Sequence, residues 1–262
     1  MVTRESTVES IAENGSELAA SQFRTTMSVE TKSSKIDPVT AADRATQADI
    51  IERIEATFPD DAIVGEEEGA LKTIPETGYA WIIDPIDGTL NYSRGLNEWV
   101  TSVAVVEGCE PIAAANVAPA LGDTYTATAE SVTRNETALS VSETTDPESF
   151  LVASTLRLQT ADHERIGVLA DRIIERFGEF RRTGSAQLTL SLVASGSLDA
   201  VIGFDMDPKP WDTVGGVFQV RRAGGTVTDL DGDQWTPGGP GLVASNGQCH
   251  DAVLAIAQET VE

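Results

Sequence analysis

The sequence has little positive charge. Of its 262 residues, 18 are Lys or Arg and 42 are Asp or Glu, which gives a formal net charge of −24. Such a surface repels phosphate backbones and argues against a DNA- or RNA-binding protein. Because the acids are spread along the chain rather than gathered in one block, we interpret them as an adaptation to a salt-rich cytoplasm, as in a halophile. An acidic patch for a binding partner is the alternative.

Long apolar runs are also missing. No stretch of about 18 apolar residues occurs, so no membrane span is predicted. The first ten residues, MVTRESTVES, are polar and lack the apolar core of a signal peptide. The default expectation is therefore a soluble protein of the cytoplasm.

Cysteine and histidine are scarce. Cys109 and Cys249 are far apart and form no CxxC pattern, so neither a zinc site nor a disulfide framework is supported. We expect both cysteines to be buried as small hydrophobic residues. His163 and His250 lie in predicted helices without a matching ligand partner, which favours surface or capping roles.

The apolar pattern, with 40% hydrophobic residues, is sufficient for a sizeable core. It predicts two helices, at 8–27 and 41–58, joined by a polar loop, and then strands at 62–68, 79–87, 98–108, 111–120 and 123–130. From residue 150 onward, strands alternate with helices. The fold class is therefore α/β with α+β mixing. We expect an N-terminal lobe, 1–142, and a C-terminal lobe, 143–262, that meet in the polar segment 142–149.

Acidic residues follow three of the apolar strands. They are Glu66, Glu67 and Glu68 after AIVG, Asp84 and Asp87 after WII, and Asp205, Asp207 and Asp212 after AVIGF. An acid at the end of a buried strand must be paired, hydrogen-bonded or metal-bound. Hard oxygen ligands suit Mg²⁺, and two such ions can activate water and stabilise a departing oxygen. The alternatives are solvated surface acids and, for DPIDG, a plain turn.

The residues after Asp87 add a possible phosphate site. Gly88 permits close backbone approach, and Thr89 can open a short helix through Asn91 and Tyr92. The exposed N–H groups at such a helix start can cradle a phosphate. No His or Cys is placed as a covalent nucleophile, so direct attack by metal-activated water is the simpler mechanism. Carboxylates beside a phosphate cradle indicate a metal-dependent phosphatase.

Five segments occur in the order expected for a known family. They are DPVTAAD (37–43), GEE (65–67), WIIDPIDGTLNY (81–92), GSA (184–186) and PWDTVGG (210–216). Together they resemble the inositol monophosphatase family. The resemblance implies a layered αβαβα sandwich of the sugar-phosphatase type, usually a homodimer. It also implies hydrolysis of a small-molecule phosphate monoester with two or three Mg²⁺ ions per active site, often inhibited by lithium.

The resemblance assigns the metal ligands residue by residue. Glu66, Asp84 and the carbonyl of Ile86 match the ligands of a first ion. Asp84, Asp87 and Asp212 match those of a second, so that Asp84 bridges the two ions. These five positions are the expected metal site.

Catalytic and substrate roles are implied in the same way. Thr89 and Asp43 match a pair that orients the attacking water, and Glu67 is expected to support the waters of the metal site. The N–H groups of Gly88 and Thr89 match phosphate contacts. The other expected contacts are Lys32 near a third, weaker metal site, Arg181, Gly184, Ser185 and Ala186 around the leaving group, and Asp205, where the family often has Glu.

The substrate stays open at this point. Inositol 1-phosphate and fructose 1,6-bisphosphate both fit, and Arg181, Arg182 and Lys209 would favour the bisphosphate if they bind a second phosphate. A phosphatase acting on 3′-phosphoadenosine 5′-phosphate or NADP is an alternative. A metal-binding regulatory protein that kept the fold without the activity is a second alternative, from a different functional class.

Overall fold

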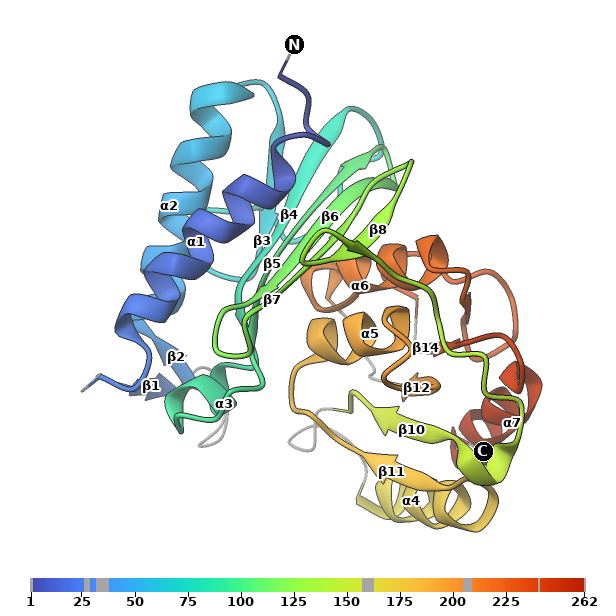
Figure 1. Ribbon diagram of the computed structural model, residues 1–262. Coiled ribbons are helices and arrows are strands. Elements are labelled where there is room, and N and C mark those ends of the chain that lie inside the picture. Colours follow the sequence, from blue (N-terminus) through green and yellow to red (C-terminus); the bar gives the residue numbers. More distant parts are fainter. Residues whose placement is uncertain are drawn as a thin grey trace.

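The computed structural model describes residues 2–25, 29–31, 38–156, 163–204, 209–239 and 241–261. For residues 29–31 and 38–40 it describes the backbone alone. Within these ranges, seven α-helices and two large mixed sheets alternate in five layers (Figure 1). The order helix, sheet, helix, sheet, helix is the αβαβα sandwich that the sequence predicts.

The first two layers are built from the N-terminal half. Helices α1 (Val8–Gln22) and α2 (Ala41–Thr57) cover one face of a seven-stranded sheet. Its strands, in spatial order, are β3 (Ala62–Gly65), β4 (Tyr79–Asp87), β5 (Val100–Glu107), β6 (Glu110–Ala118), β7 (Asp123–Ala127), β8 (Val132–Arg134) and β9 (Thr137–Ala138). Strands β3 and β4 are parallel, and the remaining neighbours are antiparallel.

The alternation of side chains along β4 separates two cores. Trp81 and Ile83 pack with residues of α1 and α2, whereas Ala80 and Ile82 belong to the core beneath the central helices α5 (Ala186–Ala194) and α6 (Pro210–Arg222). Successive side chains of a strand point to opposite faces, so a continuous apolar run is what a sheet covered on both faces requires. Asp84 falls on the face of Ala80 and Ile82 and is thereby directed toward the central helices.

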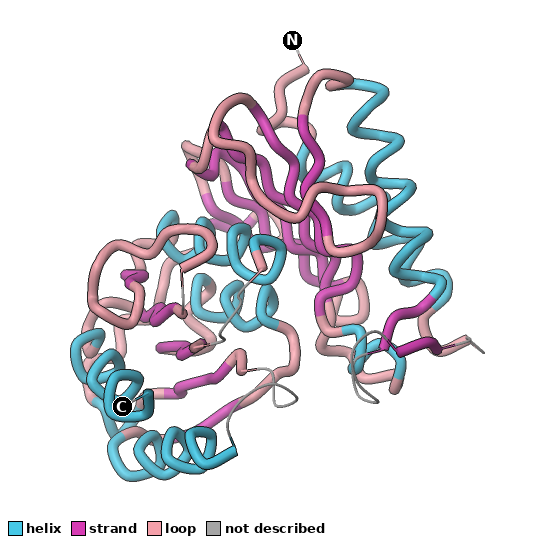
Figure 2. The backbone as a smooth tube through the Cα atoms, turned by 180° about the vertical axis from the view of Figure 1, so that it is seen from behind, coloured by secondary structure: helices cyan, strands magenta, loops and turns pink. Residues whose placement is uncertain are grey.

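The second sheet lies beyond the central helices. Its strands, in spatial order, are β11 (Glu179–Arg181), β10 (Leu151–Ser154), β12 (Ala200–Gly203), β14 (Leu242–Ser245) and β13 (Thr226–Thr228). Helices α4 (His163–Arg176) and α7 (His250–Val261) cover its outer face with an apolar core. Figure 2 shows the same layering from behind, with helices outside each sheet and between the two sheets.

Close packing of the central helices explains the double glycine of PWDTVGG. A Cβ atom on Gly216 would lie 2.4 Å from the Cβ of Leu190 in α5, closer than real atoms approach. Gly215 faces the polar side chains of Ser102, Asn116 and Gln187. The two glycines therefore allow α5 to approach α6 directly behind the first turn, where Asp212 lies.

The structure differs from the sequence-based prediction in three places. The segment expected to be a polar loop contains two short antiparallel strands, β1 (Val29–Thr31) and β2 (Pro38–Thr40), whose β-branched residues favour extended backbone. The third strand of the chain ends at Gly65, so the glutamates after it lie in a turn. Cys109 is exposed rather than buried, because it lies in the turn between β5 and β6, and Cys249 is only partly buried.

Two short elements complete the description. Helix α3 (Thr89–Ser93) follows β4, as expected, and a single 3-10 turn, η1 (Pro147–Ser149), precedes β10. A search of the described helices for one long and apolar enough to cross a bilayer finds none.

Candidate metal and phosphate site

Strand β4 ends in an irregularity that brings two aspartates to one side. Asp84 pairs with Ser102 and Asp87 with Val100, so β4 advances three residues where β5 advances two. In a regular strand, residues three apart point to opposite faces, whereas one extra residue restores a common side. Pro85 falls within the irregular stretch, where its lack of an N–H breaks no ladder bond.

Three carboxylates meet at this point. One oxygen each of Asp84, Asp87 and Asp212 lies within 4.8 Å of the others, with Asp212 supplied by the first turn of α6. Asp84 and Asp87 are buried. Burial raises the pKa of Asp87 to about 7, the charge of Asp212 adds to the rise, and a hydrogen bond from Ser185 opposes it. Crowded, buried carboxylates of this kind fit a divalent cation, which supplies the missing positive charge and prefers oxygen ligands.

Glu66 and Glu67 enter the site from the neighbouring strand. Because β3 runs parallel to β4 with Gly65 opposite Ile83, Glu66 follows beside Asp84, and its N–H donates to Ile83 O at 3.3 Å. Glu66 is not part of the tight three-carboxylate cluster. Glu67 is buried, and its N–H donates to Gln47 Oε1 at 2.9 Å. The backbone thus places both glutamates at the edge where β4 ends.

Lys72 fastens the turn that carries these glutamates. Its Nζ donates to the carbonyl oxygens of Gly65, Glu66 and Glu67 at 2.7, 2.9 and 2.7 Å. The ammonium also lies 5.4 Å from the ring centroid of Trp211, the residue before Asp212. One of the four lysines of the chain therefore connects the β3 exit to the start of α6.

Asp43 and Thr89 lie within hydrogen-bond distance of each other, as the family resemblance implies. Asp43 is fully buried in the first turn of α2. Thr89 Oγ1 lies 3.1 Å from Asp43 Oδ1 and 3.0 Å from the carbonyl oxygen of Ile86. The hydroxyl has one proton, so it donates to one of these two oxygens at a time.

Gly88 makes the turn from β4 into α3. Its φ of 97° lies in the left-handed region, and a Cβ there would come within 2.9 Å of Glu98 O. A side chain is therefore excluded at this point. The turn places the backbone of Gly88 and Thr89 directly after Asp87, where the sequence predicts phosphate contacts.

The segment 184–186 contacts the acid cluster itself. Ser185 caps α5: its Oγ accepts from Leu188 N at 3.2 Å and donates to Asp87 Oδ2 at 2.5 Å. Gly184, with a φ of 84°, passes close to the side chain of Asn91. Ser185 was expected beside the leaving group, and the structure adds to that expectation a direct role in holding Asp87.

Of the remaining predicted contacts, the structure describes Arg181, Arg182 and Lys209. Arg181 is exposed, with its Nε 3.7 Å from Glu179 Oε1. Arg182 donates to Leu156 O at 3.3 Å, and Lys209 stands directly before α6. Lys32, Asp205 and Asp207 lie outside the described residues.

Sequence reasoning missed three residues that organise the site. Besides Lys72, they are Asn91, whose Nδ2 donates to Glu98 O at 2.6 Å and Thr183 O at 2.8 Å, and Gln187, which contacts both Asp87 and α6. The signal for Gln187 was a large polar residue at the start of an otherwise apolar helix, AQLTLSLVA. Lys72 and Asn91 gave no such signal, because their partners are backbone carbonyls.

Known proteins resemble this chain in sequence and in fold. The model of the inositol monophosphatase family matches residues 3–262. A fructose-1,6-bisphosphatase/inositol-1-monophosphatase of Thermotoga maritima is 35% identical over 236 residues, covering 89% of this chain and 88% of the relative. A histidinol-phosphatase of Mycobacterium tuberculosis is 33% identical over 235 residues, covering 84% of each.

A solved structure extends the comparison to three dimensions. An IMPase of Thermotoga maritima superposes with a TM-score of 0.87 and 31% sequence identity, covering 96% of this chain and 95% of that one. The named relatives are phosphatases of different small molecules, so they fix the reaction class and leave the substrate open. The chain belongs to the inositol monophosphatase family and is a metal-dependent phosphate monoester hydrolase.

Proposed function

We propose that the chain hydrolyses a small sugar or cyclitol phosphate, inositol 1-phosphate or fructose 1,6-bisphosphate, with Mg²⁺ as its metal. The observation that carries the proposal is the three-carboxylate cluster of Asp84, Asp87 and Asp212 beside the joined pair of Thr89 and Asp43. The relative from Thermotoga maritima, named for both substrates, supports this choice.

The proposed metal site holds two ions, with a third binding more weakly. Glu66, Asp84 and the carbonyl of Ile86 would bind one ion, and Asp84, Asp87 and Asp212 the other. When bound, Mg²⁺ supplies charge neutralisation for the phosphate and acidifies a water molecule. The chain keeps Asp87 in place for this task through hydrogen bonds from Ser185 Oγ and Gln187 N.

Thr89 and Asp43 are proposed to orient the attacking water. A hydrogen bond to a carboxylate is stronger than one to a neutral carbonyl, so Thr89 is expected to donate to Asp43. Two consequences follow: the hydroxyl oxygen can accept a hydrogen bond from the water, and the carbonyl of Ile86 is left available as a metal ligand. Asp43 is fully buried, and Glu67 would bind further waters.

Substrate recognition is proposed to involve both halves of the chain. The N–H groups of Gly88 and Thr89 would bind the phosphate, and Gly184, Ser185 and Ala186 would line the leaving group. Asp205 is retained as a proposed contact of the sugar or cyclitol, Arg181 as a proposed contact of the leaving group or of a second phosphate, and Lys32 as a residue near the weaker third metal site. The division into lobes 1–142 and 143–262 is part of this proposal, since the acid cluster draws on both.

Phosphate release is the direct test. Inositol 1-phosphate, fructose 1,6-bisphosphate, histidinol phosphate, 3′-phosphoadenosine 5′-phosphate and NADP are offered in parallel with Mg²⁺, and Asp87→Asn is the blank. We expect Mg²⁺-dependent release that is fastest with one of the first two. Faster release from one of the other three would reassign the substrate. No release from any of them would favour the metal-binding regulatory protein.

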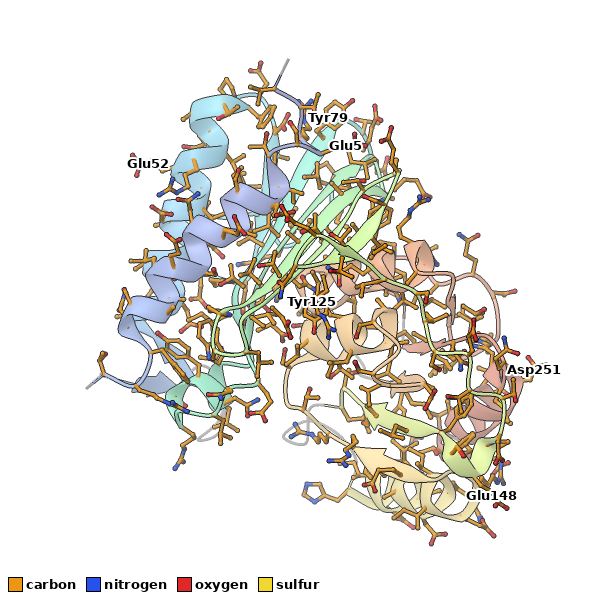
Figure 3. All side chains as sticks on the ribbon, viewed as in Figure 1. Glu5, Glu52, Tyr79, Tyr125, Glu148 and Asp251 are labelled. Atoms are coloured by element: carbon orange, nitrogen blue, oxygen red, sulfur yellow. The ribbon has the colours of Figure 1, made fainter. Side chains whose placement is uncertain are left out.

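We also propose that the protein forms a homodimer and that it functions in a cytoplasm with a high salt concentration. Glu52, Glu148 and Asp251 are exposed and point away from different sides of the molecule (Figure 3). Because salt screens repulsion between such groups, the melting temperature should rise as KCl increases. Light scattering at the same KCl concentrations would report the oligomeric state. A melting temperature indifferent to KCl contradicts the salt adaptation.

A further inference from the structure

The central helical layer contains a buried polar network. It consists of Asn116 on β6, Gln187 and Ser191 on α5, and Gln219 on α6, all at most 1% exposed. Asn116 Nδ2 donates to Ser191 Oγ at 2.9 Å and to Gln187 Oε1 at 3.2 Å, and Ser191 Oγ donates to Gln219 Oε1 at 2.7 Å. The side-chain oxygen of Asn116 is buried without a hydrogen-bond partner among the described residues, whereas the side-chain polar atoms of Gln187, Ser191 and Gln219 are all bonded.

One member of the network reaches the acid cluster from two directions. The backbone N–H of Gln187 donates to Asp87 Oδ2 at 2.7 Å. Its side-chain Nε2 donates to Trp211 O at 2.6 Å, and its Oε1 accepts from Gly216 N at 2.7 Å. Trp211 directly precedes Asp212, so one residue is bonded both to one acid of the cluster and to the helical turn that carries another.

The side-chain amide of Gln187 can reach the backbone of α6 because positions 215 and 216 are glycines. Cβ atoms on Gly215 and Gly216 would lie 3.4 Å and 3.0 Å from Gln187 Oε1. The second of these distances is tighter than an ordinary contact, and the same atom on Gly216 would also clash with Leu190. On the side that faces α5, the backbone of α6 is therefore not covered by side chains. A glutamine can form hydrogen bonds with this backbone, whereas an aliphatic side chain can make only van der Waals contact.

From this geometry we infer that Gln187 is a positioning residue that fixes the separation of Asp87 and Asp212, and with it the affinity for the metal. The inference rests on the proposed function, in which both aspartates are metal ligands. Asp87 comes from the end of β4 and Asp212 from the start of α6, so their spacing depends on how α6 docks. Residues that orient ligands from behind contribute about 10–100-fold to metal affinity in other metal sites.

The test replaces the amide and leaves the backbone bond to Asp87 intact. Gln187→Met keeps the length and volume of the side chain and removes both bonds to α6. We expect the dissociation constant for Mn²⁺, measured by electron paramagnetic resonance on the enzyme without substrate, to rise about 10–100-fold. At saturating Mg²⁺, kcat should recover most of its normal value, because the reacting groups are unchanged.

Gln219→Met is the matched control. It is the same chemical change in the same network, and it removes bonds to Ser191, Asn116 and Tyr125 O, none of which involves the first turn of α6. We expect its melting temperature to fall by a similar amount and its Mn²⁺ dissociation constant to stay within about twofold of the unaltered protein.

The outcomes separate the alternatives. A selective loss of Mn²⁺ affinity in Gln187→Met supports the inference. Equal Mn²⁺ affinities in the two variants, or no change in Gln187→Met, overturn it and leave Gln187 a purely structural residue. If the unaltered protein itself binds no Mn²⁺, the proposed metal site fails and the inference fails with it. Should Gln187→Met not fold, Gln187→Asn, which retains the amide but cannot reach α6, takes its place in the same comparison.

Discussion

The end of β4 and the outer core behind the second sheet are built on opposite principles. In the outer core, apolar side chains of α4, α7 and the five-stranded sheet, such as Leu169, Ile173 and Val243, pack against each other. At the end of β4, buried carboxylates crowd together, and Asp87 has a pKa raised to about 7 by burial. The first region stabilises the fold by removing apolar surface from water, and the second opposes folding until a cation is bound.

This contrast separates stability from function along the chain. Substitutions at the end of β4 should remove activity without lowering the stability of the metal-free protein. Substitutions in the outer core should do the reverse. Four variants test the separation, in order of decreasing expected effect.

Asp87→Asn should have the largest effect. We expect kcat/KM to fall at least about a thousandfold, equivalent to about 4 kcal/mol, because a ligand charge is lost. The melting temperature without metal should not fall, since the amide oxygen can still accept from Ser185 and Gln187 while repulsion with Asp212 disappears. Phosphate release and calorimetry measure the two quantities. The exposed Asp171→Asn is the control, and activity within tenfold of normal would contradict the assignment.

Ile173→Ala tests the opposite region. Ile173 is fully buried between α4 and the second sheet, so its truncation should cost about 2–5 kcal/mol of unfolding free energy. Its kcat/KM should stay unchanged well below the melting temperature. Ile174→Ala is a matched control one residue away, because that side chain is 67% exposed and should change stability by less than about 0.5 kcal/mol. A loss of activity in Ile173→Ala would show that the two regions are coupled.

Thr89→Val sharpens the comparison within the site. Valine keeps the shape of the side chain and removes the hydroxyl that contacts Asp43 and Ile86 O. We expect activity to fall about 10–100-fold, with Mn²⁺ binding largely retained, as measured by phosphate release and metal titration. Thr89→Ser keeps the hydroxyl and should restore most of the activity. If serine rescues no better than valine, the hydroxyl does not orient the water.

His250→Gln addresses a titratable group at the edge of the outer core and should have the smallest effect. His250 bridges Ser245 Oγ at 2.8 Å and Thr228 Oγ1 at 3.0 Å, and burial lowers its pKa, with Asp251 opposing the shift. Below about pH 6.5 the unfolded chain therefore binds more protons at this position than the folded one. The contribution of His250 to the free energy of unfolding should therefore fall as the pH decreases from about 7 toward 5, whereas the raised pKa of Asp87 acts in the opposite direction.

Denaturant unfolding at pH 7.5 and 5.5 measures this dependence. His250→Gln, which cannot titrate, should lose this contribution and so be relatively more stable at pH 5.5 than the unaltered protein, whereas the control His163→Gln, at an exposed position, should behave like the unaltered protein. Identical pH dependence in the two variants would mean that His250 is not the group responsible.

Much of the fold and of the site could be predicted from local patterns. The apolar run before Asp84, the glycine after Asp87 and the start of α6 at Pro210 are each visible within a few residues of sequence. They predict acidic metal ligands at the end of β4 and near the start of α6, whereas the grouping of Asp84, Asp87 and Asp212 and the pairing of Thr89 with Asp43 were implied by the family resemblance; the structure brings these residues together.

The rest depends on contacts between distant segments. The partners of Gln187 on α6 cannot be predicted from its own helix, and the three backbone carbonyls that Lys72 binds cannot be predicted from its position in the sequence. The neighbour of Arg181 could not be predicted either: the side chain is exposed beside Glu179 on β11, the edge strand of its sheet. The pair β1 and β2 was missed because each strand has only three residues and polar neighbours.

The bonds of Asp87 to Ser185 and Gln187 span 98 and 100 residues of chain. Contacts that close such long loops form late in folding, because the chain loses conformational entropy on closure before the new contact stabilises the folded state. In a chain that has formed only its first sheet, Asp84 and Asp87 are already in place at the end of β4. The hydrogen bonds from Ser185 and Gln187 to Asp87 are still missing, and Asp212 is not yet beside them. The capacity to bind metal therefore arises with the docking of the two halves. During refolding, the return of Mn²⁺ binding would mark the final assembly step rather than the first collapse.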